Sequence, residues 1–521
     1  MWPRRNALWL CCALLIPAAA VSQKPTDSQS ELAARVGEVI LAPQYRQGRW
    51  GLLVQDLATG QTLIQHNADQ SFIPASSIKL YFCAAALAEL GPKHRFETPV
   101  FRRGEVRDGI LEGDLILRGQ GDPTLGGRDT TQGTMAFTDD DHTYANATGA
   151  LSTLTDTDPL AGLNVLARQV AAAGIREVHG DVLIDDRLFD LTRNNGNGPD
   201  WLSPIVVNDN LVDLLVTPGH EVGAAANVQM RPLTSLFAVR NEVITVGERE
   251  PSRVQAALTG HFVIRLRGQI ALKSRGLLRN VPVQDPGMFA RFLFVEALSR
   301  AGVRLVRTAS VALLPSRTEY ARLPRVAVLT SLPLEELLKV TLKTSSNVYA
   351  NTLPLVVAAK YGETTYAQGL KRLERRLGAL GVDLAGVSLA TASGGTTKDR
   401  LTPLSAVQVL RTLHGRKEFA GFFEALPVLG VDGTLADVVA AGSPARGKVR
   451  AKTGTFFQPA TRDRGAMLHC KALAGVTTTA RGRELAFAFF VNDVPLPPGV
   501  DSTREARALG RLCEILYLQA P

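Results

Sequence analysis

The sequence predicts an α+β fold in which both ends of the chain contribute to one sheet and a β-rich region is inserted early. Three observations support this prediction. Strand-like runs occur near the start and again near the end, helical spacing dominates the second half, and short alternating runs separated by turns fill residues 94–286. With 521 residues, the chain is long enough for more than one domain.

The first part of the chain contains a helix, a hairpin and a second helix. Apolar residues recur at helical spacing over 30–41, and the strand-like runs 50–57 and 61–65 are separated by a short turn that contains glycine. A buried helix is predicted from Ile78 to Leu90, because its apolar run stops at a glycine-proline pair. The hairpin therefore leads into an apolar helix.

Residues 94–286 are expected to form an inserted β-rich region of two small domains. An amphipathic helix is predicted at 160–173, and a long surface loop rich in threonine, aspartate and glycine at 126–158. Loops of that length are uncommon in compact domains. The strand-like runs of this region are 113–119, 180–186, 211–218, 243–246 and 261–266.

The second half is helical before it returns to strands. Its predicted helices are 288–301, 333–342, 347–360, 366–380 and 405–413, and its predicted strands are 448–455, 472–479 and 484–492. A final helix begins at Thr503, where Ser502 and Glu505 have the spacing of a capping box. Two strands near the start and three near the end predict one sheet closed by both ends of the chain.

The composition is that of a soluble globular protein with an export signal. Hydrophobic residues make up 45% and charged residues 21%, and the formal net charge of +9 is too diffuse to indicate nucleic-acid binding. Residues 1–20 combine two arginines, an apolar run and an A-x-A site, which predicts a secretory signal peptide. No other stretch offers about twenty uninterrupted apolar residues, so we expect no transmembrane anchor.

Cysteine and histidine spacing argues against a disulfide framework or a metal site. Beyond the leader only Cys83, Cys470 and Cys513 occur, an odd number without metal-ligand spacing. Cys83 and Cys513 lie on apolar helix faces and are expected in the core. The eight histidines show no H-E-x-x-H pattern, so we expect neither a metal nor another cofactor.

Ser76 and Lys79 form an S-x-x-K motif at the start of the apolar helix. Positions three apart share one helical face, so the hydroxyl and the amine can meet. Burial lowers the pKa of a lysine, and a free amine can take the serine proton. The pair therefore has the chemistry of a nucleophile and its base, although S-x-x-K also occurs by chance about twice in a chain of this length.

Two further motifs follow in the second half. Ser345 and Asn347 form an S-x-N motif that leads into a helix, where such residues are usually caps. Residues 452–455, Lys-Thr-Gly-Thr, lie on a predicted strand whose glycine lets an extended substrate approach. Lys452 and the hydroxyls of Thr453 and Thr455 can hold a carboxylate. Each motif alone is weak evidence, and it is their order along the chain that is informative.

The ordered trio S-x-x-K, S-x-N and K-T-G resembles that of β-lactamases and penicillin-binding proteins. Between Lys79 and Ser345 lie 265 residues, too many for a compact β-lactamase. With this spacing the chain resembles the class C low-molecular-mass penicillin-binding proteins, the D-alanyl-D-alanine carboxypeptidase/endopeptidase family. Further stretches carry the resemblance over nearly the whole mature chain: 113–125, 180–190, 208–219 and 430–435.

The resemblance implies a penicillin-binding-protein/β-lactamase-like catalytic domain, with an antiparallel sheet and helices on both faces. It implies a signal peptide at 1–20, a catalytic domain in two parts at 21–93 and 287–521, and the insert at 94–286 between the first two motifs. The insert is expected to be a separable module that supplies neither nucleophile nor base. No oligomeric state is predicted.

The resemblance further implies an exported serine peptidase that hydrolyses peptidoglycan stem peptides or cross-links through an acyl-enzyme and binds β-lactams covalently. Ser76 would be the nucleophile and Lys79 its base, and Ser345 and Asn347 would relay protons and hold the substrate. Residues 452–455, including Gly454, would bind the terminal carboxylate. Asp185 and Asp186 would line the pocket for the substrate side chain.

Two stretches depart from the family pattern. Residues 392–398 lack the arginine of the matching family motif, and 456–471 are longer than the usual turn. Two alternative functions remain open. One is a β-lactamase or esterase on the same catalytic domain, which would release hydrolysed penicillin quickly. The other is a wall-binding or antibiotic-sensing protein that binds muropeptide without turnover.

Overall fold

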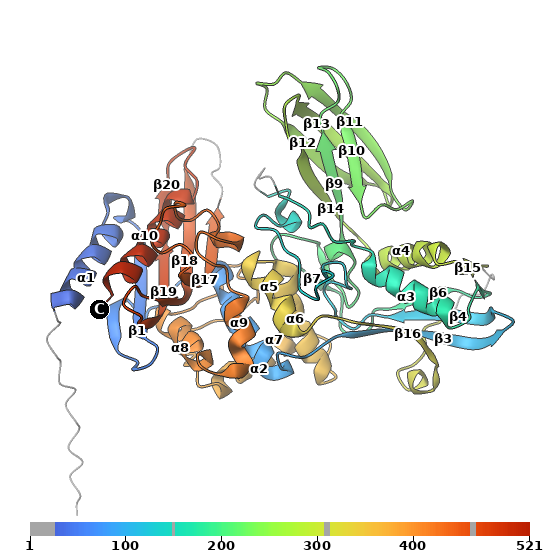
Figure 1. Ribbon diagram of the computed structural model, residues 1–521, viewed down its shortest axis with the longest axis horizontal. Coiled ribbons are helices and arrows are strands. Elements are labelled where there is room, and N and C mark those ends of the chain that lie inside the picture. The colour runs from blue at the N-terminus through green and yellow to red at the C-terminus, as the bar shows by residue number, and fades with distance from the viewer. Residues whose placement is uncertain (1–26, 148–151, 307–312, 459–464, 521) are drawn as a thin grey trace, which may run out of the picture.

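The computed structural model describes residues 27–147, 152–306, 313–458 and 465–520, so the predicted signal peptide lies outside the described residues (Figure 1). Its main sheet has the strand order β17-β18-β19-β1-β2, and β20 pairs with β18. The pairing is antiparallel throughout. The prediction of one sheet built from both ends of the chain is therefore confirmed. Its strands are β1 (Arg49–Asp56), β2 (Thr62–His66), β17 (Val449–Gln458), β18 (Ala466–Thr478), β19 (Glu484–Asn492) and β20 (Val494–Leu496).

Helices cover both faces of this sheet because its strands are apolar on both sides. Along β19, Phe487 and Phe489 pack with α1 (Asp27–Ile40) and α10 (Thr503–Gln519), whereas Ala488 and Phe490 pack with the layer of α2 (Lys79–Leu90) and α8 (Pro403–Leu413). The alternation follows the period of two of an extended strand. Figure 1 shows α1 and α10 side by side on one face. The predicted α+β class is confirmed.

Helix α2 lies at the centre of the second layer and is buried on almost every side. Its residues from Lys79 to Leu87 are all buried, as expected for a helix that is apolar all round. The run Cys83–Ala86 is small, which lets the neighbouring helices approach closely. These neighbours are α8, α5 (Leu334–Lys343), α6 (Asn347–Lys360), α7 (Tyr366–Ala379) and α9 (Ala420–Glu424).

The insert begins where the sequence predicted but ends later. The chain leaves the catalytic unit near His94 and returns near Leu334, where Leu334 N donates to His94 O at 2.8 Å. Helix α4 (Pro286–Arg300) packs in the apolar core of the insert, and β16 (Arg325–Thr330) pairs with β3 (Glu97–Arg107). The expected division after residue 286 is therefore wrong by about one helix and two strands, because helical spacing alone does not tell which core a helix covers.

The insert contains a mixed sheet and two small three-stranded sheets. The mixed sheet has the order β15-β5-β4-β3-β16, with β6 paired to β4, and is covered by α3 and α4. The small sheets project from it (Figure 1), yet all three share one apolar cluster. The elements are β4 (Ile110–Arg118), α3 (Ala161–Ala172), β5 (Glu177–Val178), β6 (Val182–Asp185), β9 (Leu211–Thr217), β10 (Asn227–Arg231), β11 (Ala238–Val246), β12 (Arg253–Thr259), β13 (Val263–Ala271), β14 (Leu277–Pro282) and β15 (Arg304–Leu305).

Several local predictions need adjustment. Strands β17 and β18 continue into the stretch 456–471, which was expected to be a loop, and residues 459–464 lie outside the described part. The predicted capping box at α10 is wrong, because Ser502 makes no cap and Asp501 accepts the Thr503 N–H at 2.9 Å instead. The remaining strands are β7 (Thr192–Arg193) and β8 (Trp201–Leu202), and the 3-10 turns are 43–45, 75–78, 142–144, 208–210, 319–322, 417–419 and 433–435.

The three described cysteines, Cys83, Cys470 and Cys513, are buried and unpaired, which agrees with the expected core positions of Cys83 and Cys513. Within the described ranges, no helix combines the length and the apolar character needed to cross a bilayer.

Candidate active site

The first motif lies in a tight turn that leads into α2. Ser76 belongs to the 3-10 turn Ala75–Ile78, and Lys79 is the first residue of α2, so the two side chains lie on one face. Lys79 Nζ is 2.9 Å from Ser76 Oγ. Ala75 adopts a positive φ of 46°, a conformation that is uncommon for a residue with a side chain. The strained turn presents the Ser76 hydroxyl to the adjacent cleft.

The second motif approaches the same lysine from the other side. Asn347 begins α6, and its Oδ1 accepts a hydrogen bond from Lys79 Nζ at 2.8 Å. Ser345 lies in the preceding loop with φ of 63°, and its Oγ is 3.4 Å from Lys79 Nζ and 2.9 Å from Lys452 Nζ. The Ser345 hydroxyl therefore bridges the two lysines.

The third motif lies on the edge strand β17, directly against the serine turn. A Cβ atom at Gly454 would lie 2.4 Å from Pro74 O, so only glycine allows the strand to approach this closely. Lys452 is fully buried and also donates to Thr453 O at 2.9 Å. Thr453 and Thr455 face the cleft that contains Ser76. The structure thus brings together eight of the ten site residues predicted from the sequence.

Burial determines the electrostatics of the two lysines. Burial, together with the charge of Lys452, lowers the pKa of Lys79 well below its usual value. Burial also lowers the pKa of Lys452, to about 7. In the described part of the chain neither lysine has a carboxylate partner within ion-pair distance, so their charges are not compensated by direct pairing. A neutral amine at Lys79 is the state that this site favours.

The carbonyl of Ser393 is a site group that the sequence did not indicate. It accepts a hydrogen bond from Lys79 Nζ at 2.9 Å and lies 3.3 Å from Ser76 Oγ. The next residue, Gly394, has φ of 82°, and a Cβ atom there would lie 2.0 Å from Ala75 O. The signal was present as the Ser-Gly-Gly run within 392–398, but its spacing from the other motifs is not fixed.

The insert also supplies part of the cleft, which the sequence did not predict. The cleft has a volume of about 210 Å³ and is lined by Asp139, Asp140 and Tyr144 in addition to motif residues. The Tyr144 hydroxyl donates to the carbonyl of Ser345 at 2.7 Å. Burial and the neighbouring Asp139 raise the pKa of Asp140. The insert therefore forms an acidic wall of the site and supports a motif residue, which is more than a separable module would do.

Asp185 and Asp186 do not line this cleft, and their expected role in the pocket for the substrate side chain stays a prediction. Asp185 ends β6 and accepts hydrogen bonds from Arg187 and Tyr320, the latter at 2.7 Å. Asp186 lies beside Gly287 at the start of α4. Pairing of β6 with β4 places Asp185 in the mixed sheet of the insert, and β6 lies far from β17 (Figure 1).

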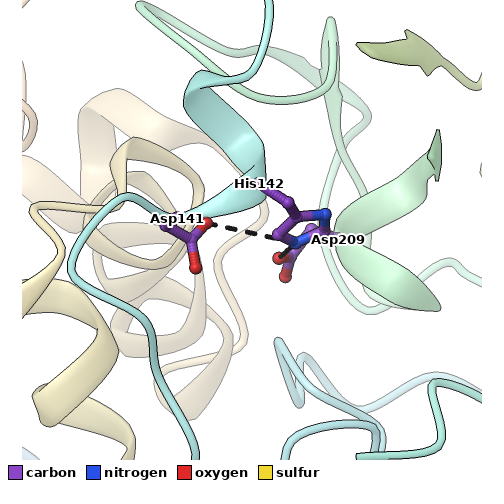
Figure 2. A group of neighbouring side chains, drawn as sticks. All are labelled: Asp141, His142 and Asp209. Carbon is purple, nitrogen blue, oxygen red and sulfur yellow. Dashed lines mark hydrogen bonds and ion pairs between the residues drawn. The ribbon is translucent and has the colours of Figure 1, made fainter. Parts of the chain in front are cut away.

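Behind the acidic wall lies a buried group of charged side chains, of which Figure 2 shows Asp141, His142 and Asp209. Arg128 binds Asp141 at 2.7 Å and Asp209 at 2.6 Å. The two ring nitrogens of His142 face Asp209 at 2.7 Å and Asp213 at 2.9 Å. Although burial opposes it, these carboxylates raise the pKa of His142 to about 10. Both imidazole nitrogens therefore carry protons in this state, and these ion pairs link the segments behind the wall.

Comparison with known proteins finds relatives that are similar over most of this chain. The chain is 28% identical over 555 residues to a D-alanyl-D-alanine carboxypeptidase of Actinomadura sp. (strain R39), covering 99% of this chain and 92% of the relative. It is 24% identical to D-alanyl-D-alanine carboxypeptidase DacB of Haemophilus influenzae, covering 85% of each chain.

A solved structure extends the agreement to the fold. Penicillin binding protein 4 from Haemophilus influenzae superposes with a TM-score of 0.68 at 20% identity, covering 92% of this chain and 98% of that structure. The sequence also matches the D-Ala-D-Ala carboxypeptidase 3 (S13) family over residues 32–509. This match covers all three motifs and the whole insert, and it confirms the resemblance inferred from the motifs. The chain belongs to the D-Ala-D-Ala carboxypeptidase 3 (S13) family.

Proposed function

We propose that the protein hydrolyses D-Ala-D-Ala stem peptides or cross-links of peptidoglycan through an acyl-enzyme on Ser76, and that β-lactams acylate the same serine. The contacts of Lys79 carry this proposal. Its amine lies 2.8 Å from Asn347 Oδ1 and 2.9 Å from Ser393 O, which are two pure acceptors, and 2.9 Å from Ser76 Oγ. A neutral amine has two N–H donors and one lone pair, so the lone pair is left for the Ser76 proton.

In the proposed reaction Lys79 acts first and Lys452 helps in the proton transfer that follows. Lys79 takes the Ser76 proton as Oγ attacks the carbonyl carbon of the penultimate residue. The proton then passes to the leaving amine through Ser345, whose hydroxyl lies between Lys79 and Lys452. A pKa of about 7 for Lys452 suits a group that helps to move a proton near neutral pH. Water then hydrolyses the acyl-enzyme, with Lys79 again as the base. The backbone N–H groups of Ser76 and Thr455 are proposed as the oxyanion hole.

The terminal carboxylate of the substrate is assigned to the threonine side of the cleft. Thr453 and Thr455 line it together with Thr434, which accepts a hydrogen bond from Thr453 Oγ1 at 2.8 Å. The Lys452 amine lies close by and donates to the carbonyl of Thr453 at 2.9 Å. Replacing Lys452 with alanine should weaken substrates that bear a carboxylate, while an ester without one should lose little.

The proposed place of action is outside the cytoplasm, at the cell wall. The predicted signal peptide supports this, as do relatives named as D-alanyl-D-alanine carboxypeptidases. A complex of the Haemophilus influenzae penicillin binding protein 4 with a β-lactam supports β-lactams as ligands of this site.

Acylation by penicillin tests the assignment of the nucleophile. Ser77 offers a matched control, since its hydroxyl is buried and donates to Pro74 O at 2.7 Å. Mass spectrometry should find one adduct on the wild-type protein and on Ser77→Ala, and none on Ser76→Ala. An adduct that peptide mapping places on Ser77 or Ser345 would refute the assignment. Rapid loss of the adduct with release of hydrolysed penicillin would favour the β-lactamase alternative, and muropeptide binding without D-Ala release would favour the sensor.

A further inference from the structure

A second cavity lies against the third motif, on the side of α10. Its volume is about 130 Å³. Three of its wall residues, Thr434, Thr453 and Thr455, also line the cleft that contains Ser76, so the two spaces meet at these hydroxyls. The rest of its wall is mainly apolar: Leu435, Val438, Ala472, Leu473, Ala506 and Leu509. This cavity is not needed for the chemistry proposed above.

One cation, Lys471, lies in the wall of this cavity. Lys471 is paired with Thr455 in the register of β17 and β18, so the two side chains leave the same face of the sheet. Lys471 Nζ donates to Ser502 Oγ at 3.1 Å. Burial lowers its pKa, although Glu505 and Asp501 oppose this effect. The Glu505 carboxylate is itself held by an adjacent arginine. Lys471 is therefore a half-buried lysine whose amine, within the described residues, is bound directly only by a hydroxyl.

The position of the cavity follows from that of the substrate. If the terminal carboxylate is bound at Thr453 and Thr455, the side chain of the same leaving residue begins beside these hydroxyls, at the mouth of the cavity. The methyl group of D-alanine would leave most of the space empty. A cavity of roughly 150 Å³ with an apolar wall accepts a group as large as benzene. There is room here for an unbranched side chain that is several carbon atoms longer.

We propose that this cavity is a subsite for the side chain of the leaving D-residue, selecting a chain with an apolar stem and a carboxylate or carbonyl oxygen at its end, which Lys471 binds. This inference rests on the proposed function, because it takes Ser76 as the nucleophile. The substrate class it implies is a cross-linked peptide, in which the leaving residue is a diamino acid whose side chain continues into a neighbouring stem. The apolar wall holds the methylenes, and Lys471 holds the polar group that follows them.

Three synthetic peptides test the subsite directly. They have the form acyl-D-Ala-D-X, where X is alanine, norleucine or 2-aminoadipate, and the measured quantity is kcat/KM for release of X. Ala506→Leu fills the cavity, and it should lower the norleucine-to-alanine ratio about tenfold or more, the effect expected for methylenes in an apolar pocket. Ala33→Leu adds the same atoms at an exposed position of α1 and should leave the ratio unchanged.

The charge of Lys471 is tested separately. Lys471→Met keeps the length of the side chain without the amine, and it should abolish a preference for 2-aminoadipate over norleucine. Lys448→Met, at an exposed lysine beside the start of β17, is the control and should keep that preference.

Failure of the subsite and failure of the proposed function give different results. A wild-type protein that releases D-alanine but rejects both longer residues overturns the subsite alone. So do folded Ala506→Leu and Lys471→Met variants that keep both wild-type ratios. A protein that hydrolyses none of the peptides and is not acylated by penicillin refutes the proposed function, and the subsite with it.

Discussion

Asn347→Asp replaces the amide next to Lys79 with a carboxylate. The substitution tests whether the neutral amine of Lys79 is the reactive form. The substitution keeps the shape of the side chain but places a carboxylate where the amide oxygen lies, 2.8 Å from Lys79 Nζ. A negative charge at that distance favours the protonated lysine. Protonated Lys79 cannot take the Ser76 proton, so we expect acylation by penicillin to be slow at neutral pH and to recover as the pH rises.

The distance sets the size of the effect. At an effective dielectric constant of about 20, two unit charges 2.8 Å apart attract by about 6 kcal/mol, which is an upper limit because burial also penalises the new carboxylate. Even a quarter of that energy, about 1.5 kcal/mol, corresponds to about one pH unit. The midpoint of the pH profile for acylation should therefore rise by about one unit or more relative to the wild type.

The assay is the acylation rate measured from about pH 6 to pH 10, with folding checked by circular dichroism. Asn351→Asp is the matched control: Asn351 is buried one turn further along α6, but its amide contacts Asn194 and Tyr366 instead of Lys79. Its pH profile should coincide with that of the wild type. If Asn347→Asp leaves the midpoint where it is, Lys79 is not the base and the proposed mechanism fails.

Three further predictions concern the base, the insert and the buried ion pairs. Lys79→Met should lower the acylation rate by about 10²–10⁴-fold, the usual contribution of a general base, while the thermal midpoint stays equal or rises because a buried amine is removed; wild-type rates would mean that another group activates Ser76. Tyr144→Phe should slow acylation about fivefold, the equivalent of about 1 kcal/mol for the hydrogen bond to Ser345 O, and an unchanged rate would show that the insert does not support this residue. The pKa of His142 is about 10 in the folded protein, above its usual unfolded value, so its stabilisation is complete below about pH 6.5 and is lost as the pH rises toward 10. Thermal melts should show a decline over this range that is smaller in His142→Gln, and equal slopes would contradict the assignment.

Local sequence patterns were enough for the elements of the catalytic unit and for the motifs. Continuous apolar runs predicted β19 and α2, and the i, i+3 spacing of Ser76 and Lys79 predicted their contact, since each depends on neighbours within one turn or strand. The end of the insert was misplaced because the apolar residues of α4 could pack in either core. The position of Asp185 and Asp186 outside the Ser76 cleft could not be predicted, because strand pairing, which sequence spacing does not encode, decides which sheet edge a strand end reaches.

The sequence by itself determined the candidates for nucleophile and base and the order of the three motifs, because these are residue identities at fixed short spacings. Only the tertiary structure decided that the Ser393 carbonyl completes the surroundings of Lys79, that Tyr144 and the acidic wall come from the insert, and that Lys471 borders a cavity beside the cleft. These contacts join segments far apart in the chain, or, for Lys471, depend on what covers one face of a strand. The distances between the contacting groups depend on how whole layers of helices and strands pack together. A local pattern of side chains does not predict that packing.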